Sequence, residues 1–194
     1  SFVATAATQM QFEDLKVRSA EFEAESGQTL KLTIDLVGKT KSIPSITVPS
    51  IAVGVTPEDL PLIFHYATLL LGGTDYCFSR FRLRIENTIE DLFYNSKNAV
   101  CLDEGQLRVT GQFDLPWNSD TATALYGHGQ DGLAASIKFL TAPADSYLTI
   151  ALASAKWPNR TPKIPDQKAI QFPLEFRSFS TSSNPSVKFT HTVV

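Results

Sequence analysis

Apolar residues recur at every second position in many short runs of this chain, and this alternation limits the folds that it can adopt. Leu30, Leu32, Ile34 and Leu36 form one such run before Gly38. An extended strand points successive side chains to opposite faces, so period two predicts strands that are buried on one side of a sheet. Runs of the same kind occupy residues 81–85, 107–113, 133–139, 148–152, 170–176 and 187–193.

One segment carries the signals of a helix instead. Ser119-Asp120 can cap its start, the residues 121–126 can form a short body, and Gly127 can end it. Seven or eight strands and one short helix at about 119–127 predict a mostly β fold, either an antiparallel β-sandwich or a partly closed barrel. Neither a shift in composition nor an internal repeat divides the sequence, so we expect a single domain over residues 1–194.

The first predicted hairpin changes its alternation part-way along. Leu15 and Val17 fall on one face, whereas Ala20 and Phe22 fall on the other. One extra residue in a strand shifts the alternation in this way, which predicts a β-bulge near Arg18–Ser19.

Two segments are predicted to be irregular. Residues 42–61 hold four prolines, which a central strand does not tolerate, so we expect a crossing loop with one short extended piece. Residues 87–104 are polar and acidic, and we expect a long loop or arm there.

Composition supports a sheet and excludes several other classes of protein. The chain has 19 Thr and 17 Ser, so 36 hydroxyls stand beside 37 charged residues. β-branched residues pack well on a pleated surface, which disfavours a helical bundle, a coiled coil or a disordered tail. A net charge of −3 argues against a protein that grips nucleic-acid phosphates broadly. No apolar run approaches the roughly 18 residues that cross a membrane as a helix.

The two cysteines, Cys77 and Cys101, leave two alternatives open. They could form one disulfide, or they could remain two buried thiols of a cytosolic protein. Small secreted folds that depend on disulfides carry more cysteines than this chain does, so we favour the thiols.

No sequence motif points to catalysis or to a cofactor. Residues 127–132 match G-x-G-x-x-G, but that motif binds a dinucleotide only where a strand enters it and a helix leaves. Here a predicted helix enters and a strand follows, which favours a glycine-rich helix end. His65, His128 and His191 lie far apart, with no second ligand at metal-binding spacing. We therefore expect no catalytic, cofactor-binding or metal-binding residues, and no enzyme.

Two stripes of like charge are more informative than these motifs. Like charges in a row along one strand face repel each other unless they are solvated or face opposite charge. The stripes are either two wet strand faces, paired with each other across a sheet, or surfaces that meet partners such as neighbouring subunits or a passing polyanion. They consist of Glu21, Glu23 and Glu25 in one strand and Arg80, Arg82 and Arg84 in another.

Charge is also uneven along the chain. Residues 86–120 include seven acidic and two basic residues, whereas the chain from Lys156 onward includes six basic and two acidic residues. Unlike patches on identical copies favour head-to-tail association. Polar loops whose charge has no such role are the alternative.

Four segments, in this order, resemble phage tail tube proteins. The hairpin that runs from Phe12 to Lys39 is similar to a hairpin of those proteins. In that hairpin one strand leads through a Gly turn into a second strand, which ends in Gly-Lys. Residues 83–90 resemble their strand that enters an Asn-centred loop, and residues 106–113 resemble the strand before their single helix. Residues 157–165, followed by 170–176, resemble their closing Pro-rich loop and strand. Relatives generally carry a further N-terminal segment, so the resemblance implies a fragment or a shorter variant.

The resemblance implies a structural subunit of the virion tail that is assembled in the cytoplasm of the bacterial host. Tail tube subunits form stacked hexameric rings whose inner strands join into one barrel. DNA and the tape-measure protein pass through the lumen, whose usually acidic lining does not hold the DNA. The implied partners are therefore further copies of the chain, the tape-measure protein and other tail proteins, with no membrane and no sequence-specific DNA binding.

The same resemblance suggests roles for the charged segments. We expect the face of Glu21, Glu23 and Glu25 to line the lumen or a ring interface, with the arginine stripe as a further interface candidate. The arm at residues 87–104 and the basic C-terminal third are expected to make contacts between subunits and between rings.

A β-sandwich module that binds a ligand such as a carbohydrate is the alternative function. Such a module needs a flat row of exposed aromatic rings. Trp117, Tyr126, Tyr147 and Trp157 could supply that row if the fold brings them together.

Overall fold

Twelve strands make up nearly all of the chain that the computed structural model describes, namely residues 11–38, 40–42, 61–92, 101–118, 125, 131–141, 146–158 and 170–193. A small sheet pairs β1 with β4, and the other ten strands form one large antiparallel sheet. In chain order the strands are β1 (Gln11–Glu13), β2 (Lys16–Glu25), β3 (Lys31–Val37), β4 (Thr40–Ser42), β5 (Ile63–Leu71), β6 (Thr74–Asp75), β7 (Arg80–Leu92), β8 (Cys101–Pro116), β9 (Leu133–Leu140), β10 (Ser146–Lys156), β11 (Gln171–Phe179) and β12 (Lys188–Val193).

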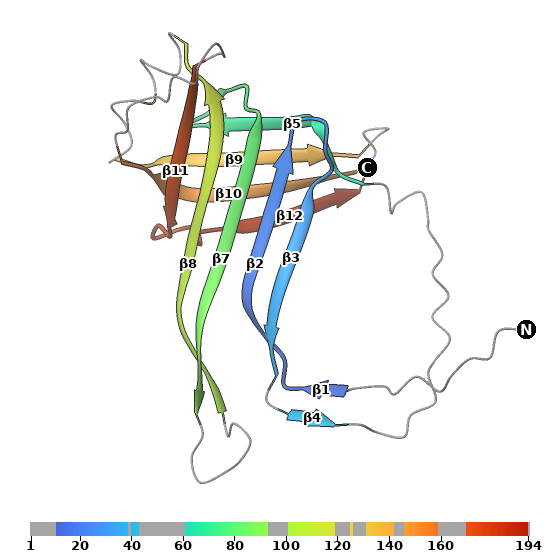
Figure 1. Cartoon of the computed structure of the whole chain (residues 1–194). Coiled ribbons are helices and arrows are strands. Elements are labelled where there is room, and N and C mark those ends of the chain that lie inside the picture. The colour runs from blue at the N-terminus through green and yellow to red at the C-terminus, as the bar shows by residue number, and fades with distance from the viewer. Residues whose placement is uncertain are drawn as a thin grey trace, which may run out of the picture.

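The large sheet folds over on itself into two layers whose strands cross one another (Figure 1). The front layer has the strand order β3-β2-β7-β8-β11, and the back layer contains β12, β10, β9, β5 and β6. β10 joins the layers, because Ser154–Lys156 pair with β11 while Ser146–Ala151 pair with β12. The sheet does not close into a barrel.

Aromatic side chains between the layers form the centre of the core. Phe81 of β7 stacks on Phe113 of β8 with ring centroids 5.6 Å apart, and it lies 5.7 Å from Phe139 of β9 in the other layer. Phe113 also stacks on Phe176 of β11 at 4.8 Å. None of these four rings is more than 4% exposed. Burying one phenylalanine contributes roughly 1.5–3 kcal/mol, so this cluster does much to hold the layers together.

The mostly β fold that the alternation predicts is confirmed. The predicted bulge is also present, because the register of β2 with β3 shifts between Val17 and Ser19 and leaves Arg18 as the extra residue. The helix expected at about 119–127 lies outside the described residues except for Leu125, which is helical and fully buried.

The alternation does not predict β5, and the structure gives the reason. Phe64 is buried near its start, whereas Leu69 and Leu71 are buried near its end, so the buried positions change from even to odd numbers. The register of β5 with β9 shifts between Ile63 and Thr68. An irregularity inside a strand hides the period-two pattern that identifies one.

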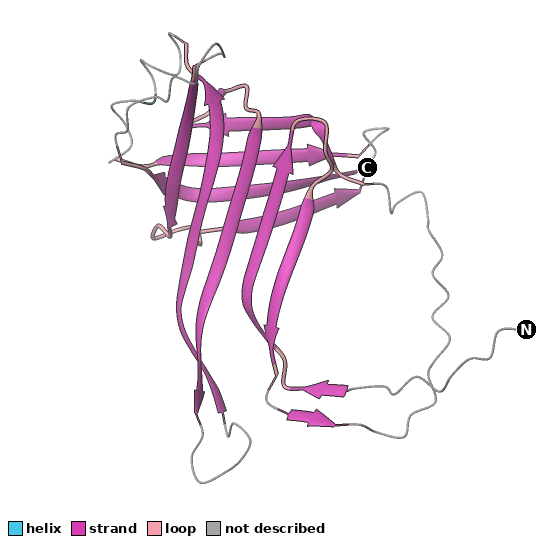
Figure 2. Ribbon diagram, in the orientation of Figure 1, coloured by secondary structure: helices cyan, strands magenta, loops and turns pink. Residues whose placement is uncertain are grey.

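Two expectations need correction. Cys77 is an exposed, unpaired cysteine and not a buried thiol; nothing is described of the Cys101 side chain. Residues 87–104 are strand at both ends and not a long loop, because β7 runs to Leu92 and β8 begins at Cys101. Together β7 and β8 extend beyond the back layer as a two-stranded arm (Figure 2). Residues 93–100, and residues 43–60 of the predicted crossing loop, lie outside the described residues.

Gly111 of β8 allows the Phe176 ring of β11 to pack into the front layer. A Cβ atom on Gly111 would lie 2.4 Å from that ring and 2.5 Å from the carbonyl oxygen of Arg82. Real Cβ atoms do not approach other atoms this closely. The aromatic cluster therefore depends on the absence of a side chain at this position.

Gly111→Ala is expected to lower the free energy of unfolding by about 1–3 kcal/mol, the range for an overpacked core. Urea denaturation of the purified chain measures this loss. Thr110→Ala is the control, because it changes the next residue of β8, whose side chain points away from the core, and costs less than about 1 kcal/mol. Equal losses from the two variants would contradict this account of the packing.

Candidate functional site

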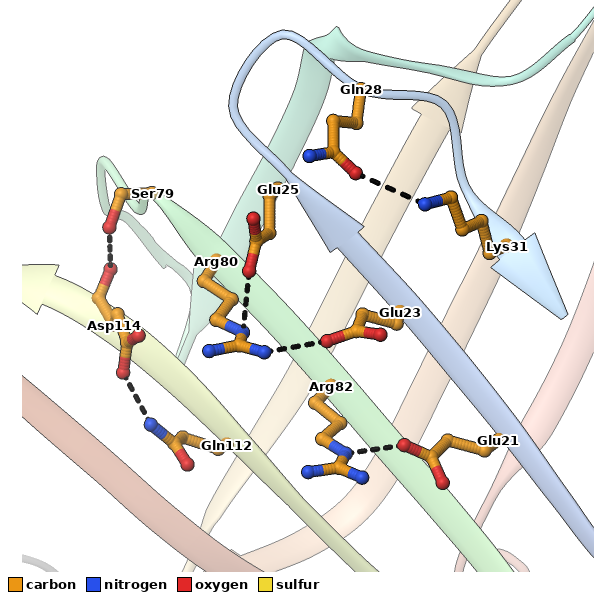
Figure 3. A network of polar contacts seen from close by, with 10 residues as sticks. All are labelled: Glu21, Glu23, Glu25, Gln28, Lys31, Ser79, Arg80, Arg82, Gln112 and Asp114. Atoms are coloured by element: carbon orange, nitrogen blue, oxygen red, sulfur yellow. Dashed lines mark hydrogen bonds and ion pairs between the residues drawn. The ribbon is translucent and has the colours of Figure 1, made fainter. Parts of the chain in front are cut away.

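The glutamate and arginine stripes lie side by side on neighbouring strands (Figure 3). β2 pairs with β7 so that Glu21 lies opposite Arg84, Glu23 opposite Arg82, and Glu25 opposite Arg80. The residues between them, such as Ala24, Phe81 and Leu83, are buried against the back layer. Both stripes therefore occupy the face of the front layer that is turned away from the back layer, which we call the charged face.

Ion pairs connect the two stripes. Arg80 binds Glu23 at 2.6 Å through Nη2 and Glu25 at 3.0 Å through Nε. Arg82 binds Glu21, which is the diagonal neighbour of Arg82 on β2 and not the residue directly opposite it. Arg84 binds Glu86 of its own strand at 2.8 Å. The arginine side chains are 40–48% exposed, so each pair contributes only about 0.2–1 kcal/mol. Of the alternatives that the sequence leaves open, pairing across the sheet is the one that the structure contains.

Arg80 is the centre of this network, and it alters the ionisation of its partner. Its hydrogen bond to Glu23 lowers the pKa of that carboxyl below the usual value, and the same bond raises the pKa of Arg80. The carboxylate of Glu23 is therefore better stabilised in the folded chain than in the unfolded chain.

The rest of the charged face is also mixed in sign. Strand pairing places residues from all five strands of the front layer on it, because residues opposite each other across a ladder share a face. Strand pairing places at least seven carboxylates and eight cations on this face, so it is close to neutral. The carboxylates are Asp35, Glu21, Glu23, Glu25, Glu86, Asp114 and Glu175; the cations are Lys16, Lys31, Arg80, Arg82, Arg84, Arg108 and Arg177, with Lys156 of β10 opposite Arg177.

An uncovered stripe of apolar side chains lies on the opposite face of the front layer. Leu32, Ile34 and Leu36 of β3 are 50–51% exposed, and Val17, which lies opposite Leu36, is 47% exposed. They point to the same side as the core residues of β2 and β7, but the back layer does not cover them. We call these four residues the apolar stripe. Their regular alternation predicts a buried strand face, and within the described chain that face has no cover.

Several strand edges of the front layer are unpaired among the described residues, including those of β3 and β8. β3 pairs with β2 alone, so its other edge has no hydrogen-bonded neighbour. β11 covers β8 only from Val109 to Pro116, which leaves the same edge of β8 open from Cys101 to Arg108. Unpaired backbone groups along a strand edge are a template for pairing with another chain.

Other candidate chemistry is not brought together in the described part of the chain. His65 of β5 and His191 of β12 are both exposed, His128 lies outside the described residues, and no described group of histidine, cysteine and carboxylate side chains could hold a metal ion. A strand, β9, follows the glycine-rich motif, as expected. No described helix is long and apolar enough to cross a membrane.

The aromatic residues considered for a carbohydrate-binding face do not form an exposed row. Trp157 is 3% exposed, and its Nε1 donates a hydrogen bond to the carbonyl oxygen of Leu125 at 3.1 Å. Trp117 is half-buried against Phe172, and the ring of Tyr147 is covered by the Lys138 ammonium at 3.8 Å. Tyr126 lies outside the described residues.

Comparison with known proteins identifies one family. A family model described as phage tail tube protein matches residues 1–178. This range includes all of β2, β3, β7 and β8 and every residue of the charged face. No curated protein matches the chain.

Glu23→Gln is expected to destabilise the chain at pH 7 by less than about 1 kcal/mol, because the ion pair is partly exposed and screened by solvent. The lowered pKa of Glu23 gives stability that is present above the ordinary carboxyl pKa of 4.5 and is lost as the pH falls through the folded value. The difference between the variant and the original chain should therefore shrink towards pH 3. Urea denaturation at several pH values measures it.

Arg80→Met supplies the matched control for this prediction. In that background Glu23→Gln should cause a smaller pH-dependent loss of stability, because the largest contribution to the lowered pKa of Glu23, the hydrogen bond from Arg80, is gone while Arg82 and Lys31 remain. The same pH dependence with and without Arg80 would show that another group is responsible.

Proposed function

The chain belongs to the phage tail tube protein family, and we propose that copies of it join side by side into closed hexameric rings that stack into a tube through which DNA passes. A structural role in the phage tail follows from the family. Ring formation, stacking, the passage of DNA and of a tape-measure protein, and assembly in the host cytoplasm are the parts that we propose.

The open edges of β3 and β8 carry this proposal. Consecutive strands in the order β3-β2-β7-β8 are antiparallel, so β3 and β8 run in opposite directions. The β3 edge of one copy can therefore pair antiparallel with the open part of β8 in the next copy, from Cys101 to Arg108. Such a contact is head-to-tail, and ring closure gives these edges of β3 and β8 a neighbour in every copy.

The apolar stripe supports the same contact. Leu107 lies in the open part of β8, is 51% exposed, and points to the same side of the sheet as the apolar stripe. Pairing β3 with β8 of the next copy brings Leu107 and the stripe onto one continuous apolar surface. Large exposed apolar surfaces next to an unpaired strand mark a site of association.

The two-layer architecture supports the choice of the charged face as the lining of the bore. Closing the front layer into a cylinder places one of its faces inside. The back layer covers the other face, and its bulk fits only on the outside of the ring. The charged face, with Glu21, Glu23 and Glu25, is then the lining. Because the arginine stripe neutralises these glutamates, this lining is balanced in charge and not strongly acidic.

The arm formed by the ends of β7 and β8 extends beyond the back layer and is suited to contacts with the next ring (Figure 2). It carries acidic residues of the stretch 86–104, and Glu104 forms an ion pair with Lys16 of β2 at 2.9 Å. The basic C-terminal third offers charge of the opposite sign for such contacts.

Ile34→Lys combined with Leu36→Lys is expected to abolish rings and tubes and to leave a folded monomer. Two ammonium groups on the apolar stripe could not be buried against a neighbouring copy without a large desolvation cost. Analytical ultracentrifugation gives the oligomeric state, and negative-stain microscopy shows whether rings or tubes form.

Thr33→Lys combined with Asp35→Lys is the control, because it changes the same strand on the charged face. These substitutions should leave assembly intact. Circular dichroism checks that both variants remain β-folded. If the unaltered chain stays strictly monomeric at high concentration, the proposal of rings is wrong.

A further inference from the structure

A recess of about 420 Å³ lies on the charged face between β7, β8 and β11. We propose that this recess is a binding site for phosphate oxyanions, and that its ligand is the phosphodiester backbone of nucleic acid. Among the described residues, five cations line it and one carboxylate, that of Glu175, accompanies them. The cations are Arg82, Arg84, Arg108, Lys156 and Arg177.

Three of these cations form no ion pair with any described carboxylate. Arg82 and Arg84 are neutralised by Glu21 and Glu86, but Arg108, Lys156 and Arg177 are not. All three are exposed, and they come from three different strands, β8, β10 and β11. Like charges gathered in one concave site repel each other, and a bound anion relieves that repulsion.

Phe179 helps to hold two of these cations in place. Its ring lies 5.1 Å from the guanidinium of Arg177 and 5.9 Å from the ammonium of Lys156. Cation–π contacts of this kind contribute about 0.5–1 kcal/mol at exposed sites. The contacts orient both side chains at the edge of the recess without removing their charge.

The lining favours phosphate groups over nucleobases. Guanidinium groups match the oxygens of a phosphate with two parallel hydrogen bonds. Among the described lining residues Phe176 is the one aromatic residue, and at 4% exposed it offers no ring face on which a base could stack. Binding should therefore be independent of sequence and sensitive to salt.

The choice of a phosphodiester as the ligand rests on the proposed function, because the recess lies on the face assigned to the bore. Its affinity for phosphate does not depend on ring formation. Glutamates of β2 lie beside it on the same face, and they limit how strongly a polyanion is held. A dissociation constant of about 10⁻⁴–10⁻⁶ M is usual for binding of this kind, which is weak enough for DNA to move.

The experiment uses the full chain, below the concentration at which it assembles, and a fluorescent duplex of about 20 base pairs whose anisotropy reports binding. The triple variant Arg108→Gln, Lys156→Gln, Arg177→Gln should bind the duplex at least tenfold more weakly at low salt. The slope of log affinity against log salt should fall by about 2–3, close to one for each lost phosphate contact.

A variant with the same net charge provides the control. Lys31→Gln, Lys138→Gln, Lys188→Gln removes three cations outside the recess, and it should retain most of the affinity. An equal loss in both variants would mean that binding is diffuse, which overturns the proposal. Competition by inorganic phosphate, with chloride of the same ionic strength as reference, tests for a small-anion site, and binding of phosphate without binding of the duplex also overturns it.

Assembly of the same variants separates this proposal from the proposed function. If the triple variant keeps its affinity for the duplex but no longer forms rings, the recess receives carboxylates of a neighbouring copy, and the phosphate site is refuted. If the unaltered chain binds the duplex through the recess but never forms rings, the phosphate site stands and the tube role fails.

Discussion

The backbone N–H and C=O groups along both edges of a strand can pair with a neighbouring strand, and in the front layer of this chain only some of them do so. β11 and the β10 junction complete the upper part of the layer, where the back layer also covers its apolar face. In the lower part, β3 and the first half of β8 have open edges among the described residues, and the side chains behind β3 are uncovered. One unmet requirement, a neighbour beside these edges, therefore accounts for both the unpaired backbone and the exposed apolar stripe, and the contact that we propose with a neighbouring copy would meet both needs at once.

The charges of the front layer follow from strand register more than from composition. Because Arg80 and Arg82 lie beside the glutamates of β2, two stripes that look strongly charged in sequence neutralise each other in space. The unbalanced charge lies elsewhere, where Arg108, Lys156 and Arg177 converge from three strands. If this face lines the bore, as we propose, the lining has alternating repulsive and attractive zones, which differs from the usually acidic lining that the family resemblance implies.

Much of the fold is accessible from sequence, because most strands have one buried face and keep period two. Even the bulge at Arg18 is visible, since the apolar positions on its two sides change parity. The sequence does not predict β5, because its irregularity lies inside a short apolar run. Too few residues remain on either side of the irregularity to show period two. Register cannot be inferred in this way, so the sequence offers pairing of the glutamate and arginine stripes only as one alternative, and it does not predict that Lys156 and Arg108 line the same recess. The exposure of the apolar stripe on β3 depends on where the back layer ends, and no local pattern encodes that limit.

The long β7–β8 hairpin has a mechanical consequence. β7 has 13 residues and β8 has 16, and one continuous ladder connects their ends in the arm to the aromatic core between the layers. The register of this ladder shifts between Asn87 and Ile89, near the point where the hairpin leaves the layers. A force applied to the arm is therefore shared among many backbone hydrogen bonds and delivered to Phe81 and Phe113 at the other end. The regular ladder is interrupted at this register shift, so we expect bending of the arm to concentrate there and to leave the packing of the two layers undisturbed.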